Sequence, residues 1–151
     1  MHGSIQTKPA APTSDMKRAR INAIFVIGGG LWLTGVAWLL LHFFMVRQTD
    51  FGPSRDPLEH WSIVAHGAFA FAALWMFGVL WGTHITKRWK AKRHRRTGGL
   101  LFLIVAALSV TGYLLYYVGD DAVRELIAKS HWIIGLALPL PFLLHWLIRM
   151  R

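Results

Sequence analysis

Cysteine is absent from this sequence, and acidic residues are scarce. Without cysteine the chain can form no disulfide bond, no thiolate-held iron–sulfur cluster and no thiolate-ligated cofactor. Only 7 of the 151 residues are Asp or Glu. No combination of nucleophile, base and acid stands out, so the sequence gives no support to a hydrolase.

Charge is missing altogether from four long stretches, which cover residues 21–46, 60–86, 97–119 and 130–148. Each is long enough to span a bilayer as a helix, which takes about 20 residues. A soluble protein would have to pack four helices that are apolar on every side. The sequence therefore predicts an all-α integral membrane protein, a four-helix bundle in one domain over residues 21–151. The lack of a carboxylate inside the spans speaks against an ion-coupled carrier.

The net charge of +10 is distributed unevenly along the chain. Of the 17 basic residues, 13 precede the first stretch, lie between the second and third, or follow the fourth, and six of the seven acids lie on the opposite side. The positive-inside rule then places both termini and the loop at 87–96 in the cytoplasm. We read the basic loop at 87–96 as a topology signal near anionic lipid, not as a nucleic-acid site. The polar residues 1–20 are expected to form a disordered cytoplasmic tail.

Four of the eight histidines form two pairs on matching helical faces. His66 and His84 are 18 residues apart in the second stretch, and His131 and His145 are 14 apart in the fourth. At about 100° per residue, 18 steps make five turns and 14 steps fall about 40° short of four turns. Imidazoles that face one interior near the two edges of a membrane suggest two stacked haems, with the histidines as axial ligands of the iron.

Depth estimates separate the two proposed pairs. If each stretch is centred in the bilayer, His66 and His131 lie about 10 and 12 Å toward the outer side of the midplane. On the inner side, His145 lies about 9 Å and His84 about 16 Å from the midplane. The outer pair therefore matches well, whereas the inner pair needs a tilt, a kink or a shift of the second helix. The cofactor prediction is two haems b, or a single one if the inner pair does not form.

Further residues near the predicted outer side are secondary candidates. His42 and His60 could replace His66, bind a haem propionate or line a quinone pocket, and Arg55 and Lys129 could neutralise propionates. Pro139 and Pro141 should kink or locally unwind the fourth helix. Asp120 or Asp121 could cap a short amphipathic helix at 120–129.

The chain resembles the four-helix b-type cytochromes of bacteria, which include the membrane gamma subunits of formate dehydrogenases and nickel–iron hydrogenases. The resemblance rests on His66-Gly67, on the segment TGYLL at 111–115, and on His131 followed 14 residues later by His145. It covers residues 20–148 and implies bis-histidine ligation of two haems b, with His131 and His66 on the outer haem and His145 on the inner one. In the formate-dehydrogenase type the fourth ligand lies on the first helix, where this chain has no counterpart, so His84 would have to substitute.

These observations predict a membrane subunit that passes electrons between a quinone or quinol and a redox partner complex through one or two bis-His haems. We expect an electron-carrier subunit rather than an enzyme by itself, because the extramembrane segments are short. Such a subunit would contact lipid, quinone and other subunits, and no nucleic acid. Two alternatives stay open at this stage, a non-haem structural or assembly subunit of a membrane complex and a small four-helix transporter.

Overall fold

The computed structural model describes residues 14–50, 52–92 and 95–150. The protein is mostly helical, and four helical segments are long and apolar enough to cross a membrane. These segments are Ser14–Phe44, Pro57–Lys90, Arg95–Tyr117 and Asp121–Ile148. The predicted four-helix architecture is thus confirmed at the level of length and composition, and the orientation in a membrane stays a prediction.

Helix α1, Ser14–Phe44, begins before the point that the sequence suggested. Residues 14–20 were assigned to the polar tail, but they form the first turns of α1. Asp15 lies in the first turn, where a negative charge favours the helix dipole, and Lys, Arg, Met and Ala in this segment are good helix formers. The remainder of the predicted tail, residues 1–13, lies outside the described part of the chain.

A short β-hairpin joins the first two long helices, which an all-α prediction does not include. Strand β1, Val46–Thr49, pairs antiparallel with β2, Gly52–Arg55. Gly52 has a φ of 104°, a left-handed conformation that favours glycine at the turn. Helix α2, Pro57–Leu80, follows at once, with the Asp56 side chain accepting a hydrogen bond from the Leu58 N–H at 2.9 Å. Because Pro57 takes the first helical position, α2 starts earlier than residue 60.

The second span does not stay α-helical to its end. After Leu80 the chain makes a π-helical turn, η1, over Trp81–Ile85, and then continues as α3, Thr86–Lys90. A π turn is wider than an α turn and changes the rotation per residue. The five-turn relation between His66 and His84 therefore does not hold strictly, because His84 lies inside η1.

The C-terminal half consists of α4, Arg95–Tyr117, α5, Asp121–Ala137, and α6, Pro139–Met150. Asp120 caps α5 by accepting from the Val123 N–H at 2.9 Å, as the sequence predicts. Residues 121–129 continue without interruption into the fourth span, so the amphipathic segment is no separate helix. The disruption predicted at the prolines is confirmed, because α5 ends at Ala137 and Pro139 begins α6.

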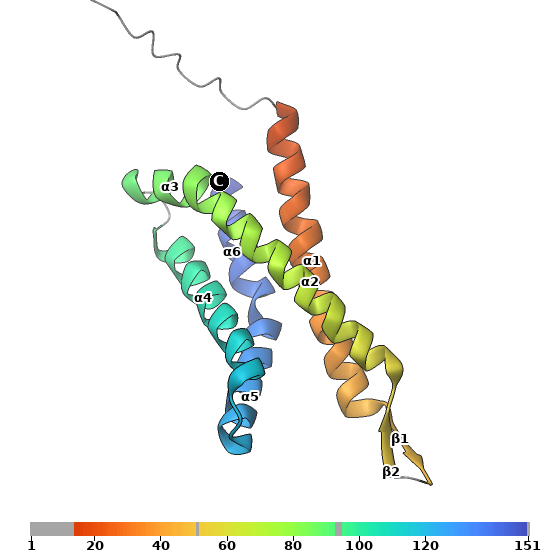
Figure 1. The fold of residues 1–151 in the computed structure, drawn as a ribbon. Coiled ribbons are helices and arrows are strands. Elements are labelled where there is room, and N and C mark those ends of the chain that lie inside the picture. Colours follow the sequence, from red (N-terminus) through yellow and green to blue (C-terminus); the bar gives the residue numbers. More distant parts are fainter. Residues whose placement is uncertain (1–13, 51, 93–94, 151) are drawn as a thin grey trace, which may run out of the picture.

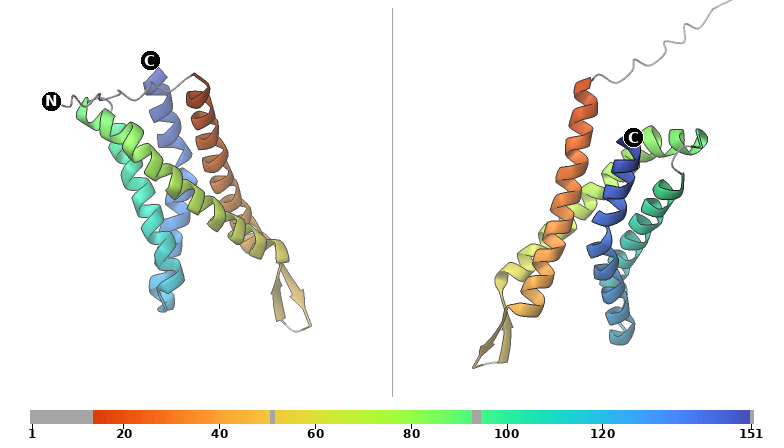
Figure 2. Two further views of the ribbon diagram at one scale, coloured as in Figure 1. Left: turned by 45° about the horizontal axis from the view of Figure 1, so that its top comes forward. Right: turned by 180° about the vertical axis from the view of Figure 1, so that it is seen from behind.

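The long helices run alternately up and down between two ends of the molecule (Figures 1 and 2). The β-hairpin and the α4–α5 turn lie at one end, here called the hairpin end. The start of α1, helix α3 and the end of α6 lie at the other, here called the basic end. Helix α1 packs along α2, and α4 packs against α5 and α6, while α1 also touches α5. Among the described residues only Met76, Asp56 and Glu59 are buried.

Candidate functional site

Two of the predicted ligands, His66 of α2 and His131 of α5, face each other across the interior. Their ring centroids lie 6.3 Å apart and their ring planes make an angle of 81°. Both side chains are half-buried. The two residues are 65 positions apart in the sequence, so only the packing of the helices brings them together.

The separation suits two imidazoles that share one metal ion. A metal–imidazole bond is about 2 Å long and the ring centre lies about 1 Å behind the nitrogen, so two trans ligands have centroids about 6 Å apart. Within the described ranges, no group of three or more His, Asp or Glu could hold a bare ion. Two imidazoles at this separation match the pair of histidine ligands that the sequence analysis expects for one haem.

The ring of His131 is oriented by a contact with helix α4. Its Nδ1 lies 2.8 Å from the Thr111 hydroxyl. The same hydroxyl lies 2.7 Å from the carbonyl of Ala107, and when it donates to that carbonyl it accepts from the ring. In the tautomer that donates from Nδ1, Nε2 of His131 keeps the lone pair that a metal ligand requires.

His66 is held in the same tautomer by helix α1. Its Nδ1 lies 3.0 Å from the Leu31 carbonyl, which can only accept, and 3.3 Å from the Thr34 hydroxyl. Thr34 in turn donates to the Gly30 carbonyl at 2.7 Å. The ring thus donates from Nδ1, as metal-bound histidines almost always do. Nε2 of His66 makes no hydrogen bond to any residue that the structure describes.

Glycines on the neighbouring helices give both rings the space that they occupy. A Cβ atom added to Gly35 of α1 would lie 3.0 Å from Cε1 of His66. A Cβ at Gly112 of α4 would lie 3.3 Å from Cε1 of His131. Each glycine directly follows the threonine that contacts the same ring. Thr34-Gly35 and Thr111-Gly112 therefore play equivalent parts. In each dipeptide the threonine contacts Nδ1 of one histidine, and the glycine leaves space for the same ring.

A third Thr-Gly dipeptide repeats this arrangement at the basic end. Thr97 Oγ1 of α4 lies 2.9 Å from Nδ1 of His145, and a Cβ on Gly98 would lie 3.8 Å from Cε1 of that ring. The sequence contains three Thr-Gly dipeptides, and each one adjoins a different predicted haem ligand. The fourth predicted ligand, His84, is half-buried in η1 and has no such dipeptide beside it among the described residues.

The secondary candidates lie elsewhere. His42 and Arg55 join Glu59 in a polar cluster at the hairpin end. His60 is exposed, with its ring beside that of Trp61, and Lys129 forms an exposed ion pair with Glu125 at 2.6 Å. Sequence reasoning missed Thr34, Thr97, Gly98 and Glu59, although the repeated Thr-Gly dipeptide was a readable signal for the first three.

Comparisons of the chain with protein-family models, curated proteins and solved structures give no match. The functional argument consequently rests on the geometry around the histidines.

Proposed function

We propose that the protein is a membrane-embedded b-type cytochrome subunit that carries single electrons between a quinone or quinol and a redox partner complex. The observation that supports this proposal best is the opposed pair His66 and His131, each with its Nδ1 proton engaged and its Nε2 lone pair available. A bound haem would supply the chemistry, since its iron takes up and releases one electron at a time.

The chain's own residues have three tasks in this proposal. His66 and His131 would hold the iron from two helices, which fixes α2 relative to α5. Thr34 and Thr111 orient the rings and prevent the proton from moving to Nε2. The apolar helices around the pair lower the local dielectric and keep water away, which influences the potential of the haem.

We propose in addition that a second haem binds at the basic end, between His145 and His84. His145 with Thr97 and Gly98 repeats the arrangement of the other site, which favours His145 as a ligand. His84 would be its partner, and it lies in η1, where the rotation per residue differs from that of an α-helix. With the basic end in the cytoplasm, as the charge distribution indicates, electrons would cross most of a bacterial inner membrane between the two sites.

Spectroscopy of the purified full chain tests the function directly. We expect a sharp Soret peak and reduced b-type bands, split if both sites are filled, and two haems per chain by haem quantification. A single haem per chain would remove the site at the basic end and leave the His66–His131 site. Protein without pigment after expression with sufficient haem would contradict the proposal and favour a structural subunit. Substrate-dependent flux through such unpigmented protein would favour a transporter.

The hydroxyl of Thr111 provides a more specific prediction. Thr111→Val keeps the side-chain shape but removes the oxygen that accepts from His131 Nδ1, and changes of this kind weaken metal sites about 10- to 100-fold. We expect that loss of haem affinity in titrations of the haem-free protein, and recovery in Thr111→Ser. The control is Thr83→Val, because the Thr83 hydroxyl donates to the Val79 carbonyl in the preceding turn of the same span. Equal affinities for Thr111→Val and Thr83→Val would contradict the role assigned to Thr111.

A further inference from the structure

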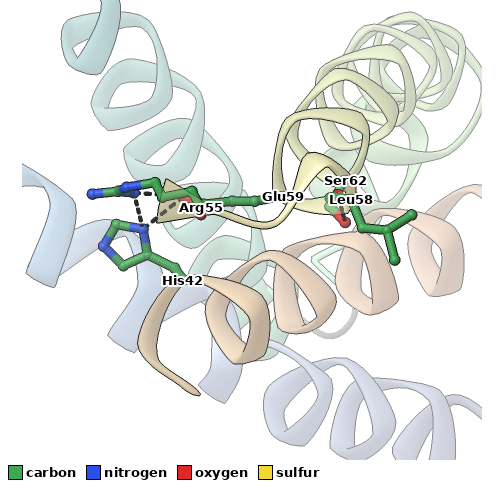
Figure 3. A network of polar contacts seen from close by, with 5 residues as sticks. All are labelled: His42, Arg55, Leu58, Glu59 and Ser62. Carbon is green, nitrogen blue, oxygen red and sulfur yellow. Dashed lines mark hydrogen bonds and ion pairs between the residues drawn. The ribbon is translucent and has the colours of Figure 1, made fainter. Parts of the chain in front are cut away.

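A buried carboxylate lies at the hairpin end, where the sequence analysis placed only a loop. Glu59, in the first turn of α2, is 7% exposed. Its Oε1 accepts from Arg55 Nη1 at 2.6 Å and lies 2.8 Å from His42 Nδ1 on α1. Figure 3 shows the three side chains converging. Glu59 is therefore an acidic residue buried between α1 and α2, next to the uncharged stretches of the sequence. The boundary between α1 and α2 is called the α1–α2 seam below.

The second carboxylate oxygen of Glu59 has no such support. Oε2 is buried and has no hydrogen-bond partner among the described residues. Leaving a charged acceptor unsatisfied away from water is costly, and such atoms in native proteins mark binding or catalytic roles. The protein in its membrane is therefore expected to receive a hydrogen bond from a donor at this atom.

The surroundings of the cluster determine which donor fits. Trp38 stacks on the His42 ring with centroids 4.6 Å apart, and Phe43 meets the same ring edge-on at 5.0 Å. These aromatic contacts hold the His42 ring in place beside Glu59. Arg55 is already neutralised by Glu59, which disfavours an anionic ligand such as a lipid phosphate. Leu58 and Phe43 are exposed, so in a bilayer the site is bordered by apolar surface open to lipid.

The cluster is also aligned with the His66–His131 site. Glu59 precedes His66 by seven residues on α2, and His42 follows Gly35 by seven residues on α1. Seven residues are nearly two helical turns, so the two sites share one helical face about 10 Å apart. Gly35 is the residue that borders the His66 ring. A ligand at Glu59 would therefore lie one step along the same α1–α2 seam from the ring of His66.

We propose that Glu59, with His42, forms a hydroquinone-binding and proton-accepting site at the hairpin end, which deepens the proposed function and rests on it. Glu59 Oε2 accepts the hydrogen bond of a quinol hydroxyl. Oxidation of the hydroquinone to the quinone releases two protons and two electrons. Glu59 takes up the protons in turn and passes each through His42, whose side chain is 25% exposed, to water. The two electrons would leave one at a time toward the haem proposed at His66 and His131, and the redox partner would reoxidise that haem between the two transfers.

The experiment uses the full chain in nanodiscs of phosphatidylethanolamine and phosphatidylglycerol, with duroquinol as the probe. Binding is measured by calorimetry on the pre-reduced protein, and electron entry is measured as the rate at which duroquinol reduces the oxidised protein. Glu59→Gln is expected to weaken binding about 10-fold or more, because a hydrogen bond to a charged acceptor is lost. It should slow reduction about 100-fold or more, since a proton acceptor is removed. His42→Gln should slow reduction, because the path of the proton to water is interrupted, and it should weaken binding less than Glu59→Gln does.

The matched control is Glu125→Gln, which removes an exposed carboxylate at the same end of the molecule. It should leave binding and reduction as in the unaltered protein. The proposal is overturned if the unaltered protein does not bind duroquinol, or if Glu59→Gln binds and reacts as Glu125→Gln does, in which case water satisfies Oε2. Calorimetry does not need a haem, so absence of the Soret peak would identify failure of the cytochrome function separately from failure of this site.

Discussion

His131→Ala is expected to abolish haem binding at the site between α2 and α5. The substitution removes one of two axial ligands and leaves His66 alone, and a single imidazole cannot hold the iron in the bis-histidine state. We expect the haem content to fall by about one per chain, with loss of the corresponding reduced b-type band. His66→Ala should have the same effect, because the two rings face each other at 6.3 Å.

The control for this experiment is His60→Ala. His60 lies on α2 only six residues from His66, but it is exposed and its ring contacts Trp61. Its removal should leave the haem content and the spectrum unchanged. Full haem content in His131→Ala, or equal losses in His60→Ala and His131→Ala, would show that the 66–131 pair is not the ligand pair.

Gly35→Val is expected to have the second largest effect, although residue 35 offers no ligand. Even a Cβ at this position would lie 3.0 Å from His66 Cε1 and 3.2 Å from its Nδ1, and the branched valine side chain adds two further methyl groups. The His66 ring would be pushed away from the position opposite His131, and overpacked sites of this kind force side chains off their preferred rotamers. We expect most of the haem at this site to be lost, measured by haem quantification of the purified protein.

Gly28→Val is the matched control for the packing argument. Gly28 lies on the same helix, seven residues before Gly35, and a Cβ there meets nothing within 4 Å. Both substitutions change the intrinsic properties of α1 equally, so helix propensity cannot account for a difference between them. The prediction fails if Gly28→Val loses as much haem as Gly35→Val.

The local features of the fold could be predicted from the sequence. The positions of the four spans follow from the length of the uncharged stretches, and the cap at Asp120 and the break at Pro139 follow from residue chemistry within one turn. The dipeptide Asp56-Pro57 is an equally local signal for the start of α2. It predicts that Glu59 lies in the first turn of the helix and not in the loop. The start of α1 differs from the prediction because residues 14–20 are polar and yet form a helix, since polar side chains do not prevent helix formation.

The candidate site could be predicted only as a set of residue types. The helical spacing of the histidines predicts that four of them form two pairs. This prediction assumes that the second span is one regular α-helix, and η1 changes the angle between His66 and His84. The three Thr-Gly dipeptides are visible in the sequence, yet a threonine on α4 cannot be assigned to His131 or His145 without knowing which helices are neighbours.

The sequence by itself determined how many segments are long and apolar enough to span a membrane, that the fourth is interrupted at Pro139, and which end carries the positive charge, because hydrophobic length and prolines act over a few neighbouring residues. Only the tertiary structure decided that His66 meets His131, which nitrogen each ring protonates, and that Glu59 is buried beside His42. These features depend on the rotation of each helix about its axis and on its lateral neighbours. Contacts between distant segments set that rotation, and helical periodicity within one segment does not contain it.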